Sequence, residues 1–273
     1  MNRRGIVWLA SYPKSGNTWV RCLIANLRSD GAAVPLNALG DALPNGASHA
    51  WLQQRVDVDI GELLPAELDR LRAAAYRQCA AQDTSLLKVH DFYHPALFPP
   101  DATLGTVYIV RDPRDVAPSW ADHMRVDLDT AIEQMGDAQR IMSQSTSAPR
   151  SQTPQRFGTW SGHVASWLQR APGPRLLLHY EALQAQPLRE ATRLARFLGL
   201  NADPARVAAA IAACSFERLR NAEKREGFVE RRQGQARFFR QGRAGAWRST
   251  LDPAQVARLT ADHGVVMAWL GYH

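Results

Sequence analysis

The chain opens with a strand-like run, a polar loop and a helix-like run, at residues 5–19: Gly5-Ile6-Val7-Trp8-Leu9-Ala10-Ser11-Tyr12-Pro13-Lys14-Ser15-Gly16-Asn17-Thr18-Trp19. Residues 5–11 suit a buried strand, and the apolar residues after the loop recur at helical spacing. Successive N–H groups at a helix N-terminus favour an anion, and Gly16 would let the backbone approach it closely. This stretch therefore predicts a P-loop-like strand-loop-helix unit that binds phosphate or a similar anion.

The loop differs from the common nucleotide-binding loop. Lys14 precedes the glycine, whereas GxxxxGK[ST] places the lysine after it. No clear acidic magnesium ligand follows a strand. Taken alone, residues 15–18 are also compatible with an ordinary strand-turn-helix connection and an exposed Lys14.

Three further apolar runs, at residues 85–90, 106–110 and 175–179, read as short strands. Between and after the strands we expect helices at residues 65–82, 157–171 and 181–199, and from Pro204 and Pro253 onward. This alternation predicts an α/β fold with a central, mainly parallel β-sheet flanked by helices, in a single domain over residues 1–273. The carboxyl ends of the strands would then share one edge, which is where ligands bind in such sheets.

Composition narrows the class of protein. No apolar run approaches the ~20 residues that span a bilayer, and the run before the loop is too short for a signal peptide. The three cysteines, Cys22, Cys79 and Cys214, form no CxxC pair, which argues against a disulfide framework or a zinc site. We therefore expect a cytoplasmic protein that holds no metal and does not insert stably into a membrane.

The net charge is +7, and residues 218–248 hold ten Lys and Arg against three Glu. Such a run is either a solvated helix face or a collar for a polyanionic ligand. A nucleic acid is a third possible partner, although no helix-turn-helix, RRM or zinc-finger pattern accompanies the charge.

The loop from Tyr12 to Trp19 resembles the 5′-phosphosulfate loop, YPKSGTTW, of the sulfotransferases that use 3′-phosphoadenosine 5′-phosphosulfate (PAPS). Its surroundings are similar to the opening of bacterial small-molecule sulfotransferases. Five more stretches resemble segments of this family in the family's order: Leu87-Lys88-Val89-His90, residues 107–120, His179-Tyr180-Glu181, Ser215-Phe216 and residues 238–247.

The resemblance implies in-line transfer of a sulfuryl group from PAPS to a hydroxyl of a small-molecule acceptor, with 3′,5′-ADP as product and no metal. Lys14 would stabilise the leaving 5′-phosphate, Lys88 would neutralise sulfonate oxygens, and His90 would take the acceptor's proton. The residues that the resemblance assigns to PAPS binding are Lys14, Ser15, Gly16, Asn17, Thr18, Trp19, Arg111, Ser119, Tyr180, Phe216, Phe238, Arg240, Gln241 and Gly242.

The chain also departs from the family's pattern. Gln241 replaces a lysine and Ala246 replaces an aspartate in the C-terminal signature RKGxxGDW. The KxxxTVxxxE dimer motif of the animal cytosolic enzymes is missing, so the oligomeric state stays open. The acceptor would be selected by loops at residues 30–62, 90–100, 122–156 and 224–238.

Three alternatives remain beside the sulfotransferase. One is a nucleotide-dependent phosphotransferase of the same fold class, which would use ATP and magnesium. Another is a basic nucleic-acid-binding protein without enzymatic activity, whose binding would depend strongly on salt. The third is a sulfotransferase that binds PAPS without turnover.

Overall fold

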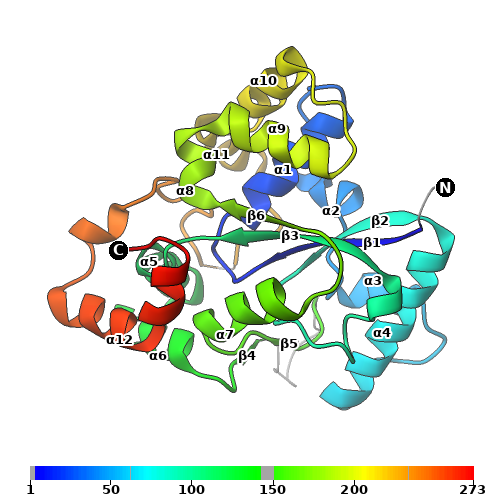
Figure 1. Ribbon diagram of the computed structural model, residues 1–273, viewed down its shortest axis with the longest axis horizontal. Helices are drawn as coiled ribbons and strands as arrows, with labels where there is room; N and C mark the ends of the chain where they lie inside the picture. Colours follow the sequence, from blue (N-terminus) through cyan, green and yellow to red (C-terminus); the bar gives the residue numbers. More distant parts are fainter. Residues whose placement is uncertain (1–3, 62, 143–150, 233) are drawn as a thin grey trace. The chain divides into compact units, whose positions relative to one another are not determined.

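The computed structural model describes residues 4–61, 63–142, 151–232 and 234–273. Its main sheet has four parallel strands in the order β2-β1-β3-β6 (Figure 1). They are β1 (Gly5–Ser11), β2 (Thr84–Val89), β3 (Thr103–Val110) and β6 (Arg175–His179). The predicted α/β fold with a central parallel sheet is therefore confirmed, and each strand lies on an apolar run found in the sequence.

Helices occupy most of the remaining chain. They are α1 (Asn17–Arg28), α2 (Leu39–Ala42), α3 (His49–Gln53), α4 (Pro65–Gln82), α5 (Pro113–Met124), α6 (Leu128–Gly136), α7 (Trp160–Ala165), α8 (Tyr180–Ala185), α9 (Pro187–Phe197), α10 (Pro204–Ala213), α11 (Phe216–Glu226) and α12 (Pro253–Trp269). The five-residue π-helical turn η3 (Ser166–Arg170) continues α7. Within the described ranges, no helix combines the length and apolar character needed to cross a membrane.

Strands β1 and β2 pair in parallel along their whole length. Gly5 lies opposite Thr84 and Ala10 lies opposite Val89. Both strands are largely buried, which explains why their sequences are nearly continuous apolar runs. This register brings the end of β1, at Ser11, beside the residue that follows β2, His90.

Contacts between residues divide the chain into two compact units. The first unit comprises residues 1–12, 44–108 and 134–177, and the second comprises residues 13–43, 109–133 and 178–273. The loop after β1 thus belongs to the second unit, whereas His90 belongs to the first.

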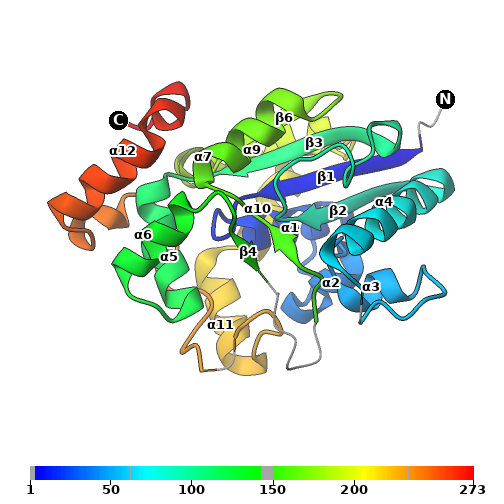
Figure 2. The same ribbon diagram turned by 90° about the horizontal axis from the view of Figure 1, so that it is seen from below.

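The first unit is built around an aromatic core against α4. Helix α4 runs beside β1 and β2 (Figure 2). Trp8 of β1 packs edge-on against Tyr76 of α4 and against Phe98, with ring centroids 5.0 and 4.9 Å apart. Edge-to-face pairs at these distances stabilise a core beyond the area that they bury.

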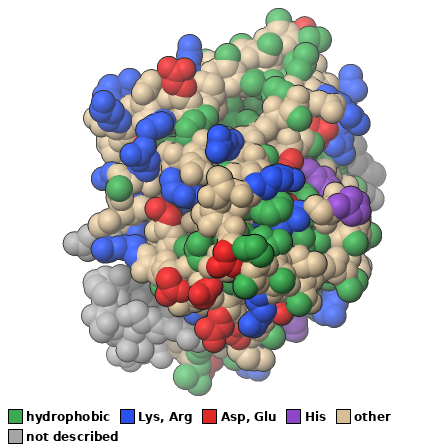
Figure 3. Space-filling view, turned by 90° about the vertical axis from the view of Figure 1, so that its left-hand side faces the viewer, with side chains coloured by type: hydrophobic (Ala, Val, Ile, Leu, Met, Phe, Trp, Pro, Cys, Tyr) green, Lys and Arg blue, Asp and Glu red, His purple; other side chains and the backbone are tan. Residues whose placement is uncertain are grey.

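The second unit packs α1 against α9 and α10, and α12 against α5. Helix α11 starts the basic run, and only Leu219 and Glu223 of its residues are buried. The basic run thus begins on a largely solvated helix face, which is one of the interpretations that its charge allows. On the face drawn in Figure 3, Lys and Arg side chains lie among acidic and apolar ones.

Several helix boundaries differ from the prediction. The helix expected at residues 181–199 is two helices, because Pro187 has no N–H to continue the first one. The helix expected at residues 157–171 begins only at Trp160, where Thr159 caps it by accepting from the Gly162 N–H. Residues 30–62, which show no periodicity, contain the short helices α2 and α3. Within the loop expected at residues 122–156, positions 143–150 lie outside the described residues, and Gln155 begins strand β5 (Gln155–Arg156), which pairs with β4 (Ile141–Met142).

Candidate functional site

The loop between β1 and α1 has the backbone of an anion cradle. Lys14 and Gly16 both adopt positive φ angles, of 67° and 98°. A Cβ atom on Gly16 would lie 2.6 Å from Cδ2 of Tyr180, so only glycine fits there. Gly16 is the N-cap of α1, and it has no side chain that could cap the helix. A helix N-terminus of this kind favours an anion, because the N–H groups of its first turn point toward it.

Two side chains, one in the cradle and one that contacts it, contain buried polar atoms that lack a hydrogen-bond partner in the described part of the chain. They are the hydroxyl of Ser15 and Nε of Arg111. Buried donors are normally paired, so two such atoms at one place are best explained by a ligand that satisfies them. Both are donors that a phosphate or sulfate oxygen could accept from, and the residues present fit an anionic group.

Lys14 is electrostatically tuned by its surroundings. Its Nζ lies 4.4 Å from the centroid of the Phe238 ring. Burial lowers its pKa from 10.5 to about 8, while Asp122 and Glu230 raise it and Arg111 and Arg240 lower it further. A lysine in this environment keeps its proton at pH 7 and gains from a nearby negative charge.

Arg111 joins the loop to the C-terminal segment. Its Nη1 donates to the carbonyl of Lys14 at 3.3 Å, and its Nη2 donates to the carbonyl of Arg243 at 3.1 Å. Its guanidinium lies 4.3 Å from the centroid of the Tyr180 ring, a cation–π contact. One side chain therefore fixes three segments that are far apart in the sequence.

The C-terminal segment, residues 238–247, is held by side chains that the sequence did not single out. Gln184 donates to the carbonyl of Gly242 and accepts from the Ala244 N–H at 2.7 Å. Asp115 accepts from the N–H groups of Gly245 and Trp247, at 2.6 and 2.9 Å. Position 246 is alanine, so the carboxylate that holds this turn comes from another part of the chain, Asp115.

Glu230 is a further residue that sequence reasoning missed. Its carboxylate accepts from the Thr18 hydroxyl at 3.2 Å and pairs with the buried Arg21. Its position as one of three acids in a basic run was the available signal, but the sequence does not indicate its partner, which lies more than 200 residues away.

The second unit holds every residue that the resemblance assigns to PAPS binding. Lys14 contacts Phe238, Gly16 contacts Tyr180, and a Cβ on Gly242 would overlap the Phe216 ring. Trp19 packs edge-on against Tyr180, with centroids 5.7 Å apart. Among the other residues that the resemblance assigns to PAPS binding, Ser119 is half-buried on α5 and Gln241 is exposed. The charge of Arg240 lowers the pKa of Lys14.

The first unit holds the predicted base, His90. Its Nδ1 lies 2.8 Å from the carbonyl oxygen of Ser11 and 3.3 Å from the Ser11 hydroxyl. Because a carbonyl can only accept, the neutral ring carries its proton on Nδ1 and its lone pair on Nε2. Lys88 is buried on β2, where its N–H and carbonyl bond to Pro44 and Gly46. The arrangement defines the tautomer that a general base would need.

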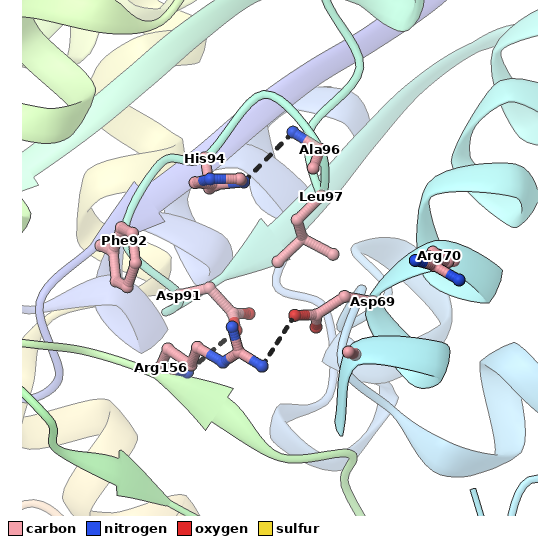
Figure 4. Close-up of a pocket in the computed structure, with 9 residues that line it drawn as sticks. Asp69, Arg70, Asp91, Phe92, His94, Ala96, Leu97 and Arg156 are labelled. Atoms are coloured by element: carbon pink, nitrogen blue, oxygen red, sulfur yellow. Dashed lines mark hydrogen bonds and ion pairs between the residues drawn. The ribbon is translucent and has the colours of Figure 1, made fainter. Parts of the chain in front are cut away.

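A pocket of about 210 Å³ lies in the first unit, lined partly by residues that follow His90 in the chain. Figure 4 shows side chains from the loop after β2 and from α4 around it. Arg156 Nη2 lies 3.3 Å from a carboxylate oxygen of Asp69, and burial raises the pKa of Asp69. His94, which also lines the pocket, accepts at Nδ1 from the Ala96 N–H at 3.2 Å. The pocket therefore has both charged and apolar walls.

Comparison with known proteins defines the family. The sequence model of the sulfotransferase domain family matches residues 5–269 of this chain. Cytosolic sulfotransferase 17 of Arabidopsis thaliana is 29% identical over 270 residues, which cover 92% of this chain and 71% of that protein. Cytosolic sulfotransferase 16 of the same plant is 26% identical over 275 residues, covering 92% and 72%. A crystal structure of retinol dehydratase with retinol and PAP shares the fold, with a TM-score of 0.62 and 20% identity over 98% of this chain and 82% of that one.

The chain belongs to the sulfotransferase family. The family predicted from the sequence is thereby confirmed, and a phosphotransferase or a nucleic-acid-binding protein is not favoured.

Proposed function

We propose that the chain transfers the sulfuryl group of PAPS to a hydroxyl of a small-molecule acceptor and releases 3′,5′-ADP, without a metal. The observation that carries this proposal is the meeting of three distant segments in the second unit. The cradle at residues 14–19, Arg111 and the C-terminal segment contact one another there. Cations and unpaired donors converge at this place, which suits a ligand with two separate phosphate-like groups.

The roles of the residues follow from their chemistry. The first turn of α1 and the Ser15 hydroxyl hold the 5′-phosphosulfate, and Lys14 stabilises the charge that grows on the leaving 5′-phosphate. Lys88 neutralises the sulfonate oxygens, and His90 accepts the acceptor's proton at Nε2. The residues that hold the 3′-phosphate are Arg111, Ser119, Arg240 and Gly242, and those around the adenine are Trp19, Tyr180 and Phe216.

The proposal also covers the domain organisation, the cellular location and the acceptor. The two units act as one sulfotransferase domain over residues 1–273, and the protein works in the cytoplasm, since its three cysteines are free and buried. The acceptor is a hydroxylated small molecule. The loop at residues 90–100 helps to select the acceptor, because part of this loop lines the pocket of the first unit.

The experiment that tests the function does not need the natural acceptor. Isothermal titration calorimetry compares 3′,5′-ADP, 5′-AMP and ATP with magnesium. We expect 3′,5′-ADP to bind at least about tenfold more tightly than 5′-AMP, because its 3′-phosphate adds charge-assisted hydrogen bonds. Transfer from radiolabelled PAPS to a panel of phenols and alcohols, in the presence of EDTA, then measures turnover. Preferential binding of ATP with magnesium, and phosphoryl transfer from it, would contradict the proposal.

The variant Gly242→Ala should lose affinity for 3′,5′-ADP by about tenfold or more. Gly242 has a φ of 62°, and an added Cβ would lie 2.1 Å from Cδ2 of Phe216. The phenyl ring must move away, and the predicted adenine contact moves with it. Gly199→Ala is the matched control, because Gly199 has a φ of 67° and nothing within 4 Å of an added Cβ. Both variants carry the backbone strain of ~1–2 kcal/mol. Equal affinity of the two variants for 3′,5′-ADP would argue against an adenine site at Phe216.

A further inference from the structure

His163 is a buried histidine of α7 that the proposed mechanism does not use. Its side chain is fully inaccessible to solvent. Burial lowers its pKa from 6.5 to about 4, so the ring is neutral at physiological pH. A neutral, inaccessible imidazole cannot take a proton from a substrate, and its role must lie in its hydrogen bonds.

Both ring nitrogens of His163 face a specific partner. Nε2 lies 3.0 Å from the backbone carbonyl of His90, and Nδ1 lies 2.7 Å from the hydroxyl of Tyr108. The carbonyl can only accept, so Nε2 carries the proton and donates it, and Nδ1 accepts from the Tyr108 hydroxyl. The three groups form one chain of hydrogen bonds that ends on the main chain of His90.

The same stretch, α7 with its continuation η3, also binds residues that follow His90. Trp167 Nε1 donates to the carbonyl of Asp91 at 2.9 Å, and the Ser166 hydroxyl accepts from the Tyr93 N–H at 2.9 Å. With His163 these residues are spaced i, i+3 and i+4, so they lie on one face of the helix. The segment after β2 is therefore held to this helix face by three side chains, and His163 holds the first of its residues.

We propose that His163 is a positioning residue for His90: it fixes the carbonyl, and hence the main chain, of the residue that receives the acceptor's proton. This inference rests on the proposed function. His90 lies one residue beyond the end of β2. Its ring is held by the Ser11 carbonyl and its backbone carbonyl by His163. A displacement of about 1 Å at a reacting group can cost ~10²-fold in rate.

Steady-state kinetics of His163→Phe and His163→Gln test the inference. The phenylalanine fills the space without a donor, whereas the glutamine amide can donate where Nε2 does. We expect kcat of His163→Phe to fall at least about tenfold, with the KM for PAPS and the affinity for 3′,5′-ADP unchanged. His163→Gln should recover most of kcat. Tyr108→Phe, which removes only the hydroxyl that fixes the tautomer, should lower kcat by a smaller factor.

A second buried histidine provides the control. His263 of α12 is 2% exposed, and burial lowers its pKa to about 4 as well. His263→Phe should lower the melting temperature about as much as His163→Phe does and leave kcat unchanged. Wild-type kcat in His163→Phe would overturn the inference, and so would an equal loss of kcat in the glutamine variant. If the His163 variants do not fold, a wild-type kcat in Tyr108→Phe would overturn it. Failure of the proposed function is distinct, since the wild-type protein itself would then not transfer sulfuryl groups from PAPS.

Discussion

Replacing Lys14 by methionine is expected to lower kcat by ~10²–10³-fold, the size of effect seen when one electrostatic stabiliser is removed from a transition state. Methionine keeps an unbranched side chain of similar length but removes the charge that lies over the Phe238 ring. Because the charge on the leaving 5′-phosphate grows only as the S–O bond breaks, the loss should fall on kcat more than on the affinity for 3′,5′-ADP. Initial rates at saturating PAPS, with calorimetry of the product, separate the two.

The chain has three lysines, and one of them serves as the control. Lys224 is exposed on α11, so Lys224→Met makes the same chemical change away from the cradle and should keep kcat. Near-normal turnover of Lys14→Met at saturating PAPS would contradict the assigned role.

The lowered pKa of Lys14 also predicts how activity depends on pH. Its pKa is lowered to about 8, so the free enzyme loses this charge as the pH rises through that value. The value of kcat/KM for PAPS reports groups of the free enzyme and should therefore decline above about pH 8. In Lys14→Arg the guanidinium stays charged, and this alkaline decline should disappear even if the maximal rate is lower.

Replacing His90 by alanine is expected to lower kcat by ~10²–10⁴-fold, the usual contribution of a general base. The hydrogen bond to the Ser11 carbonyl places the ring proton on Nδ1, so Nε2 is the atom that accepts from the acceptor hydroxyl. Binding of 3′,5′-ADP should be unaffected, because all the residues proposed to bind the nucleotide belong to the other unit of the chain.

His94, four residues later, is the natural comparison. It is exposed, and its Nδ1 accepts from the Ala96 N–H, so its tautomer is the opposite of that of His90. We expect His94→Ala to keep kcat within a few-fold of the wild type. A large loss of kcat in His94→Ala together with full activity in His90→Ala would show that His94, and not His90, is the base.

Much of the fold could be read from the sequence because the strands of the main sheet lie on short apolar runs. β1 is almost wholly buried and leaves a nearly continuous run, and both β1 and β6 were predicted with their observed boundaries. Helix α4 was predicted to the residue, since Pro65 marks its first turn. Helix α6 and the short antiparallel pair of β4 and β5 were not predicted, because short elements carry too few periodic positions to be recognised.

The candidate site could be predicted only where a local motif carries it. The cradle at residues 14–19 is such a motif, because its backbone shape depends on neighbouring residues. Glu230, Gln184 and His163 act through partners 55 to 212 positions away, and tertiary packing alone brings these side chains to them. Single-sequence reasoning has no signal for contacts of that kind.

The contact of Asp115 with the C-terminal turn bears on how this family can diverge. The carboxylate binds the N–H groups of Gly245 and Trp247, which are main-chain atoms that every residue type except proline provides. Side chains along the turn, such as the alanine at position 246, can then be exchanged without loss of these two hydrogen bonds. The residues of the C-terminal signature can therefore vary while Asp115 still holds the turn.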